Sequence, residues 1–198
     1  MRLLLIGAPG AGKGTQAERL ARRFGIAHIS SGDLLRQHVR DGTSLGQRIR
    51  SYVDAGDLVP DGLVMDMLRK PVVAASEAGG YVLDGFPRTV EQAKTAFETA
   101  QALGVEVQAA VHLEVPDEEL VRRLLARGRG SDDTQDVIEH RLKVYRERTV
   151  PLLEYYAERE WMFAVDGAQS PGTVHEDIVG RLRKLAAFSI ADGQPASG

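Results

Sequence analysis

The stretch GAPGAGKGT at residues 7–15 decides the fold of this chain. It follows the apolar run RLLLI at residues 2–6, which predicts a buried strand, and it leads into a helical pattern over residues 14–24. Its glycines let the backbone curl until successive N–H groups point inward, and the positive end of the following helix points to the same place. Lys13 adds a mobile point charge. A glycine-rich turn without a ligand is the plain alternative, but this context indicates a phosphate-binding loop, or P-loop.

This loop departs from the strict P-loop pattern at one position. Serine or threonine should follow the lysine, whereas Gly14 follows Lys13 and Thr15 comes one residue later. Many nucleotide switches use that hydroxyl to bind Mg²⁺ directly. We therefore expect Asp84, at the end of a predicted strand, to be the acidic group near the metal, through water. A solvated turn aspartate is the alternative for Asp84.

Short apolar runs alternate with longer helical patterns in the rest of the chain. The predicted strands lie at residues 2–6, 25–29, 81–83, 108–113 and 161–165, and the predicted helices at residues 14–24, 61–78, 89–103 and 136–156. Strands that alternate with helices predict βαβ units around a buried parallel sheet. Residues 30–59 interrupt this alternation and read as an insertion, whereas residues 128–134 are polar and rich in glycine. The final stretch, residues 189–198, is small and polar, and we expect it to be disordered.

Composition excludes several classes of protein. The 198 residues are 43% hydrophobic and 27% charged with a net charge of -3, which argues against a strongly basic nucleic-acid-binding protein. No apolar run approaches the roughly 20 residues of a membrane span, and the start has no signal-peptide pattern. The chain has no cysteine, which excludes disulfides, thiolate catalysis and cysteine-based zinc sites. We expect a cytoplasmic monomer.

A second polar constellation, DGFPR at residues 84–88, lies just beyond a predicted strand. Ligands of open α/β sheets bind outside the carboxyl ends of the strands. Gly85 permits close approach of the backbone, Pro87 stiffens the loop, and Arg88 offers a planar fork to a phosphate. Gln92 follows one helical turn later, so it can share the face of Arg88.

Together these motifs closely resemble adenylate kinase of the short-lid type. The matching segments are GAPGAGKGTQ (7–16), ISSGDLLR (29–36), LDGFPRTVEQ (83–92), RLLARGRGSDD (123–133) and RLKVY (141–145). The resemblance runs from residue 1 to about residue 185, which is nearly the whole chain. It implies an α/β protein with the P-loop NTPase fold: a central five-stranded parallel sheet flanked by helices, a helical AMP-binding insertion and a short lid.

The resemblance also implies one kinase domain over residues 1–198. Its parts would be a core (residues 1–29, 60–127 and 139–188), an AMP-binding insertion (30–59), a short lid (128–138) and the tail expected to be disordered (189–198). The lid contains no cysteine, so we expect no zinc in it. Mg²⁺ would enter as the companion of ATP.

Each matched position takes a role from the resemblance. Residues implied to bind ATP are Gly10, Ala11, Gly12, Lys13, Gly14, Thr15, Arg123, Arg127 and Gln169. Residues implied to bind AMP are Ser31, Gly32, Arg36, Val53, Asp57, Leu58, Val59, Gly85, Phe86, Pro87, Arg88, Gln92, Arg129 and Arg141. Residues implied to act in catalysis are Lys13, Arg88, Arg127, Arg129, Arg141 and Asp133. Asp132 or Asp133 would orient the lid arginines.

Three features depart from the family pattern. Ser31 stands where threonine is usual for AMP kinases, although the hydroxyl is kept. Asp57 stands where a basic or neutral residue is common, so we expect backbone contacts there. The lid is short even for the short-lid type. The match of Arg129 to its position in the family pattern is therefore less well defined than the match of Arg127.

The implied reaction moves the terminal phosphoryl group of Mg-ATP to AMP and yields two ADP. ATP, AMP and ADP would be the partners, with no nucleic acid and no membrane. Phosphoryl transfer needs alignment and charge neutralisation more than a reactive side chain. The phosphate of AMP has a second pKa of about 6, so it is mostly dianionic at neutral pH and needs no general base. Lysine and arginine side chains, with Mg²⁺, would offset the repulsion between the two anions.

Three alternatives stay open at this point. A UMP or CMP kinase on the same fold differs in the base, and Gln92 with the hydroxyl of Ser31 favours adenine. A nucleotide-dependent switch would carry the strict metal ligand and would not need Arg36 and Arg88 for a second phosphate. An RNA-binding module would use the arginine cluster at residues 122–129, but the acidic net charge and the lack of adjacent aromatics argue against it.

Overall fold

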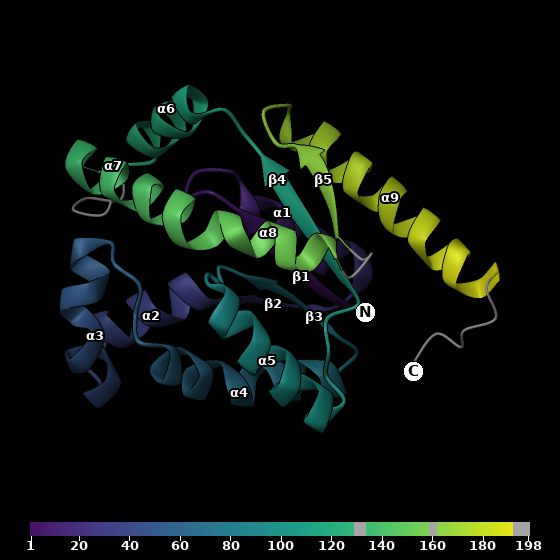
Figure 1. The fold of residues 1–198 in the computed structure, drawn as a ribbon, viewed down its shortest axis with the longest axis horizontal. Coiled ribbons are helices and arrows are strands. Elements are labelled where there is room, and N and C mark those ends of the chain that lie inside the picture. Colours follow the sequence, from purple (N-terminus) through teal and green to yellow (C-terminus); the bar gives the residue numbers. More distant parts are fainter. Residues whose placement is uncertain (129–133, 159–161, 192–198) are drawn as a thin grey trace.

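The residues that the structure describes form a five-stranded parallel sheet flanked by helices (Figure 1). The computed structural model describes residues 1–128, 134–158 and 162–191, with side chains up to residue 185. The strands are β1 (Arg2–Gly7), β2 (Ala27–Ser30), β3 (Tyr81–Asp84), β4 (Ala109–Glu114) and β5 (Met162–Asp166). Their order in space is β2-β3-β1-β4-β5, and every neighbouring pair is parallel. The predicted α/β fold is confirmed.

Helices connect these strands and cover both faces of the sheet (Figure 1). They are α1 (Lys13–Phe24), α2 (Ser31–Arg40), α3 (Ser44–Ala55), α4 (Asp61–Glu77), α5 (Val90–Leu103), α6 (Asp117–Arg127), α7 (Gln135–Val144), α8 (Val150–Ala157) and α9 (Pro171–Ala191). A π-helical turn, η2 (Tyr145–Thr149), joins α7 to α8. The helix predicted over residues 136–156 is therefore one helical rod with a π-helical turn inside it, a feature often found at functional sites.

The central strand β1 shows why the sheet is buried on both faces. Leu3 and Leu5 belong to the hydrophobic cluster that α1, α6, α7 and α9 complete, whereas Leu4 and Ile6 belong to the cluster completed by α2, α3, α4, α5 and α8. Successive side chains of a strand point to opposite faces, so an unbroken apolar run fills two cores at once. All four side chains are at most 3% exposed.

The long segment between β2 and β3 folds into α2, α3 and α4. Ser30 caps α2 by accepting the Asp33 N–H (3.2 Å), and Thr43 caps α3 by accepting the Gly46 N–H (3.0 Å). A Cβ at Gly46 would lie 1.9 Å from the His38 carbonyl oxygen, so α3 can approach α2 this closely only with glycine there. Helices α2 and α3, which lie within the predicted insertion, thus pack on each other as a pair.

The last described helix is not among the helices predicted from the sequence, and it enters the stretch that we expected to be disordered. Helix α9 runs to Ala191, three residues into the stretch from 189 that we expected to be disordered. No glycine or proline stands between Gly180 and Gly193, so nothing in the sequence ends the helix earlier. The remaining residues of that predicted tail, 192–198, lie outside the described residues.

The parallel direction of the strands gathers the predicted motifs at one edge of the sheet. The P-loop follows β1, Ser31 follows β2, and Asp84 is the last residue of β3. Gly167 follows β5 at the same edge, and its N–H donates to the Glu114 carbonyl at the end of β4 (2.7 Å). This is the edge at which open α/β sheets bind their ligands.

Candidate active site

The P-loop has the curled backbone that its glycines predict. Gly10 and Gly12 have φ values of 85° and 92°, a region that side-chain-bearing residues rarely adopt, and the Ala11 N–H turns back to the Ala8 carbonyl (3.1 Å). Gly10 also lies against α6, where an added Cβ would be 2.9 Å from Leu124. The loop leads directly into α1, so the first N–H groups of that helix face the same space.

Lys13 lies inside this curl. Its ammonium group donates to the carbonyls of Gly7 (2.8 Å) and Ala8 (2.9 Å). Burial lowers the pKa of Lys13 to about 8, Asp84 opposes that effect, and the nearby arginines lower the pKa further. Lys13 is thus a buried cation surrounded by other cations, and such an arrangement favours the binding of an anion.

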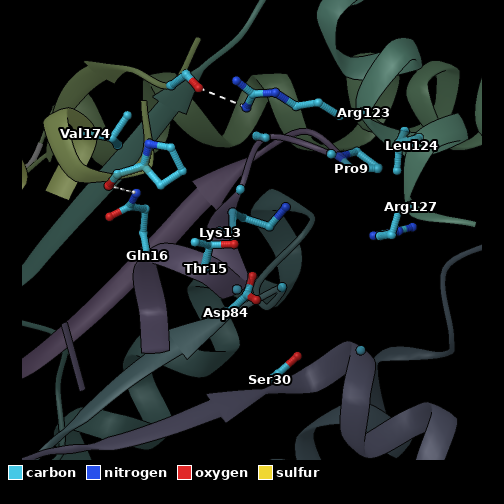
Figure 2. A pocket seen from close by; sticks show the side chains of 18 of the residues that line it. Pro9, Lys13, Thr15, Gln16, Ser30, Asp84, Arg123, Leu124, Arg127 and Val174 are labelled. Atoms are coloured by element: carbon cyan, nitrogen blue, oxygen red, sulfur yellow. Dashed lines mark hydrogen bonds between the residues drawn. The ribbon is translucent and has the colours of Figure 1, made fainter. Parts of the chain in front are cut away.

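A cleft of about 660 Å³ opens in front of the loop, which we call the main cleft. In Figure 2, Lys13, Thr15 and Asp84 lie together on one side of it, and Arg127 reaches it from α6. The predicted residues that line it are Gly10, Ala11, Gly12, Lys13, Gly14, Thr15, Gly32, Arg36, Asp84, Gly85, Arg88, Arg123, Arg127, Arg141 and Gln169. Residues from six segments far apart in the sequence therefore meet there.

A second, smaller pocket, the side pocket, adjoins the main cleft. Its predicted lining residues are Ser31, Gly32, Arg36, Val53, Asp57, Leu58, Val59, Gly85, Phe86, Arg88, Gln92 and Arg141. Pro87 lines a neighbouring pocket together with Lys13, Arg88 and Arg141. Arg36, Arg88 and Arg141 line both the main cleft and the side pocket, so these three residues lie on the boundary between the two. The predicted residues Arg129, Asp132 and Asp133 lie outside the described residues.

Arg88 is held from three directions. Its Nε donates to the Gly85 carbonyl (2.8 Å), its backbone N–H donates to the Gln92 side chain (2.7 Å), and its carbonyl accepts from the Thr149 hydroxyl (2.9 Å). Burial lowers the pKa of Arg88, Asp84 opposes that effect, and Arg36 adds to it. The arginine keeps its charge at every physiological pH, and it is aimed before any ligand arrives.

Arg123 connects α6 to the loop after β5. Its guanidinium donates to the carbonyls of Gly167 (2.9 Å) and Ala168 (3.3 Å), and its Nε donates to Glu119 (2.6 Å). Hydrogen bonds from Arg122 and Arg123 lower the pKa of Glu119 to about 2. The arginine predicted to lie near the adenine of ATP thus fixes the wall of the main cleft that carries Gln169.

Two predicted AMP-binding residues, Ser31 and Asp57, depart from the family pattern, and each has its own surroundings in the structure. The Ser31 hydroxyl is buried and has no hydrogen-bond partner among the described residues. The space beside it is kept open by Gly85, where an added Cβ would be 2.7 Å from the Ser31 oxygen. The Asp57 carboxylate pairs with His140 of α7 (2.7 Å), so this side chain turns to a protein partner, while the residue still lines the side pocket.

Sequence reasoning missed several residues of this region. Gln16 donates to the Pro171 carbonyl (2.9 Å), which Figure 2 shows beside the main cleft, and its buried Oε1 has no partner among the described residues. His28 Nε2 lies 3.9 Å from the Asp84 carboxylate. Asp61 and Thr149 contact Gln92 and Arg88 across 31 and 61 residues of sequence. A local motif contains no signal for such distant pairs.

A curled glycine loop around a buried lysine, at the carboxyl edge of a parallel sheet, defines a P-loop nucleotide-binding protein of the α/β class. The family model for adenylate kinase matches residues 5–161, and the chain belongs to the adenylate kinase family.

Known relatives agree with this assignment over most of the chain. The adenylate kinase of Mycobacteroides abscessus is 51% identical over 156 residues, which cover 79% of this chain and 86% of that protein. The adenylate kinase of Mycobacterium tuberculosis is 46% identical over 185 residues, 93% of this chain and 99% of that protein. Adenylate kinase 1 of a Nostoc species is 45% identical over 181 residues, 91% of this chain and 98% of that protein.

The described residues show neither a membrane-spanning helix nor a cluster of metal-ligating side chains. No described helix combines the length and the apolar character that a membrane crossing requires. The described part of the chain also contains no group of three or more His, Cys, Asp or Glu side chains placed to hold a metal ion.

Proposed function

We propose that this protein catalyses the reversible transfer of the terminal phosphoryl group from Mg-ATP to AMP, giving two ADP. The observation that carries the proposal is the shared boundary of the two pockets. Arg36, Arg88 and Arg141 line both the main cleft and the side pocket, with Lys13 on the side of the main cleft. Two phosphate groups, one from each pocket, would meet among these four cations. A switch that binds one nucleotide has no use for the second anion site.

The proposed mechanism rests on positioning and charge. ATP would lie in the main cleft with its phosphates on the P-loop N–H groups and Lys13, and AMP would lie in the side pocket with its phosphate on Arg36 and Arg88. The AMP phosphate itself is the nucleophile, so no general base is required. Groups that bind the transferring phosphoryl more tightly in the transition state than in the ground state raise the rate. Arg127 and Arg141 would act in this way.

Magnesium fits the main cleft as a companion of ATP. The Asp84 carboxylate lines that cleft among cations, and Thr15 lies on the same side of it (Figure 2). Mg²⁺ keeps several waters and takes few protein ligands when it is bound with phosphates. Asp84 would hold the hydrated ion through water, and the ion would neutralise charge on the phosphates. Zinc has no part in the proposal, because the chain has no cysteine.

The recognition of AMP would use the side pocket. The buried, unpartnered Ser31 hydroxyl is available to a polar group of AMP. Val53, Leu58 and Val59 would line the adenosine with apolar surface, and Gln92 would contact the edge of the base. The proposal thus favours AMP over UMP and CMP, because a smaller pyrimidine would leave a polar group of the amide that faces the base without a partner, at a cost of about 1–3 kcal/mol.

The proposed domain organisation follows from the same roles. Residues 30–59 would be the AMP-binding insertion, residues 128–138 the lid over ATP, and the rest the core. Helix α7 begins at Gln135, so the end of that lid would be helical. Arg129, held by Asp132 or Asp133, would join Arg127 when the lid closes. We propose a cytoplasmic monomer whose partners are ATP, AMP and ADP.

The acceptor assay tests the proposal. Mg-ATP is supplied with AMP, UMP or CMP at equal concentration, and formation of ADP and of the nucleoside diphosphate is followed by chromatography. The proposal expects AMP to be the best acceptor by at least about tenfold in kcat/KM, the ratio for one unsatisfied hydrogen bond. A preference for UMP or CMP would reassign the acceptor, and hydrolysis of ATP without transfer would refute the kinase.

A further inference from the structure

The amide of Gln92 has a protein partner on each of its two polar atoms. Gln92 is the third residue of α5 and is 3% exposed. Its Oε1 accepts the backbone N–H of Arg88 (2.7 Å), and its Nε2 donates to Oδ1 of Asp61 (2.6 Å). These two contacts approach the same amide from two different elements, the loop after β3 and the first turn of α4.

These partners allow only one orientation of the amide. A backbone N–H can only donate, and an ionised carboxylate can only accept. Rotation of the amide by half a turn would set Nε2 against the Arg88 N–H and Oε1 against the Asp61 carboxylate, so that two donors and two acceptors would face each other. The observed orientation still leaves one N–H and one lone pair of Gln92 for another molecule.

Asp61 acts on this site from outside it. Gln92 lines the side pocket, whereas Asp61 does not; it lies instead on an apolar groove between α4 and α5. Asp61 is the first residue of α4, and a carboxylate in the first turn of a helix interacts favourably with the helix dipole. Asp61 therefore reaches the side pocket only through Gln92.

The fixed amide matches one kind of purine. The Watson–Crick edge of adenine carries a donor at its 6-amino group beside an acceptor at N1, and this pattern suits a lone pair beside an N–H. Hypoxanthine and guanine present the reverse pattern, an acceptor at the 6-oxo group beside a donor at N1–H. We propose that Asp61 is a positioning residue that holds Gln92 in the orientation that accepts AMP and rejects 6-oxopurine nucleotides such as IMP. This inference rests on the proposed function, in which AMP occupies the side pocket.

A capping role is the competing account of the same contacts. The Thr89 hydroxyl accepts the Gln92 N–H (3.1 Å), and Ser/Thr-x-x-Gln is a known way to begin a helix. If these contacts only cap the helix, substitution of Gln92 or Asp61 should lower the stability of the fold and disturb the position of Arg88. Activity should then fall by the same factor with every acceptor. The capping account gives no reason for an effect that depends on the base.

The experiment measures kcat/KM for AMP and for IMP in five proteins: wild type, Asp61→Ala, Asp61→Asn, Gln92→Leu and Asp66→Ala. Asp66 is an exposed carboxylate on the same helix and the same groove without a contact to Gln92, so it is the matched control. We expect Asp61→Ala to lower the ratio of kcat/KM for AMP to kcat/KM for IMP about tenfold, because the substitution removes one hydrogen bond to a charged group. Asp61→Asn keeps an acceptor and should stay within about twofold of wild type. The Arg88 N–H remains in both Asp61 variants, so some preference for AMP should persist.

The outcomes separate this inference from the proposed function. No ADP from wild type with ATP and AMP would overturn both. An unchanged ratio in Asp61→Ala, together with a collapsed ratio in Gln92→Leu, would overturn the role of Asp61 and leave the kinase standing. A proportional loss for AMP and IMP would assign Asp61 to the capping account and overturn the inference. Thermal unfolding of each variant, with calorimetric binding of AMP and IMP, confirms that a change in ratio is measured on folded protein.

Discussion

Thr149 is expected to govern how firmly Arg88 is held, and the substitution Thr149→Val isolates that effect. Thr149 is 5% exposed and lies in the π-helical turn η2, where its hydroxyl donates to the Arg88 carbonyl (2.9 Å). Valine has nearly the same shape but no donor, so the substitution leaves the carbonyl without its partner in a partly buried loop. The change therefore removes one hydrogen bond and little else.

The expected magnitude follows from that single bond. An acceptor left unsatisfied costs about 1–3 kcal/mol, and the lower half of this range applies because the contact is only partly buried. For a chain of this length, each kcal/mol shifts the melting temperature by about 2–4 °C, so a loss of about 1–2 kcal/mol should lower it by about 2–8 °C. Arg88 would be held less firmly, and kcat/KM should fall by about tenfold, because phosphoryl transfer is sensitive to a small displacement of a group that positions the substrates.

Thr99→Val is the matched control for this measurement. Thr99 is a partly buried residue of α5 whose hydroxyl donates to the Thr95 carbonyl within the same helix (2.8 Å) through a solvent-exposed hydrogen bond. It has no contact with the candidate site, so its substitution should leave kcat/KM unchanged. If Thr149→Val keeps wild-type kcat/KM while its melting temperature falls, Thr149 serves stability alone and the reasoning about Arg88 is wrong.

The remaining predictions concern Lys13 and the metal. Lys13→Met should lower kcat by at least about a hundredfold while circular dichroism stays native, since the change removes charge from a loop rather than core packing; near-normal turnover would contradict the assigned role. Burial lowers the pKa of Lys13 from the ordinary 10.5 to about 8. Between these two pH values the unfolded chain binds more protons at this residue than the folded chain does. The contribution of Lys13 to the stability of the fold therefore rises with pH across this window and is least favourable below pH 8. A bound polyphosphate should raise the same pKa, so calorimetry at about pH 8.5 in buffers of different ionisation enthalpy should detect proton uptake with ATP, and Lys13→Met should abolish it. EDTA should stop transfer until Mg²⁺ is restored, whereas a zinc-selective chelator should change neither activity nor melting temperature; loss of stability with that chelator would reveal an unforeseen structural metal.

The local parts of the fold and the site could be predicted from the sequence. Nine consecutive residues are enough to identify the P-loop, and the apolar run before them predicts a strand that is buried on both faces. The loop at residues 84–88 could be placed beside it because parallel strands bring their carboxyl ends to one edge. Every predicted site residue that the structure describes lines the main cleft, the side pocket or the pocket next to them.

What could not be predicted depends on contacts between distant residues. The pattern over residues 136–156 predicts a helix, but it contains no signal for the π-helical turn at Tyr145–Thr149, whose last residue is buried and contacts Arg88. Gln92 could be recognised as a polar group near the site, yet its two partners, and hence the orientation of its amide, come from the folded arrangement of α4 and the loop after β3. The pairing of Asp57 with His140 likewise joins elements 83 residues apart.

The disproportionation of ADP tests the central claim most directly. Purified protein is mixed with ADP and Mg²⁺ alone, and the nucleotides are separated by chromatography at successive times. Two phosphate sites that share Arg36, Arg88 and Arg141 predict that ATP and AMP appear together in equal amounts, and that Lys13→Met produces neither at a comparable rate. Release of inorganic phosphate without ATP, or no change in ADP under conditions where the protein is folded, would contradict the claim that this site transfers a phosphoryl group between two nucleotides.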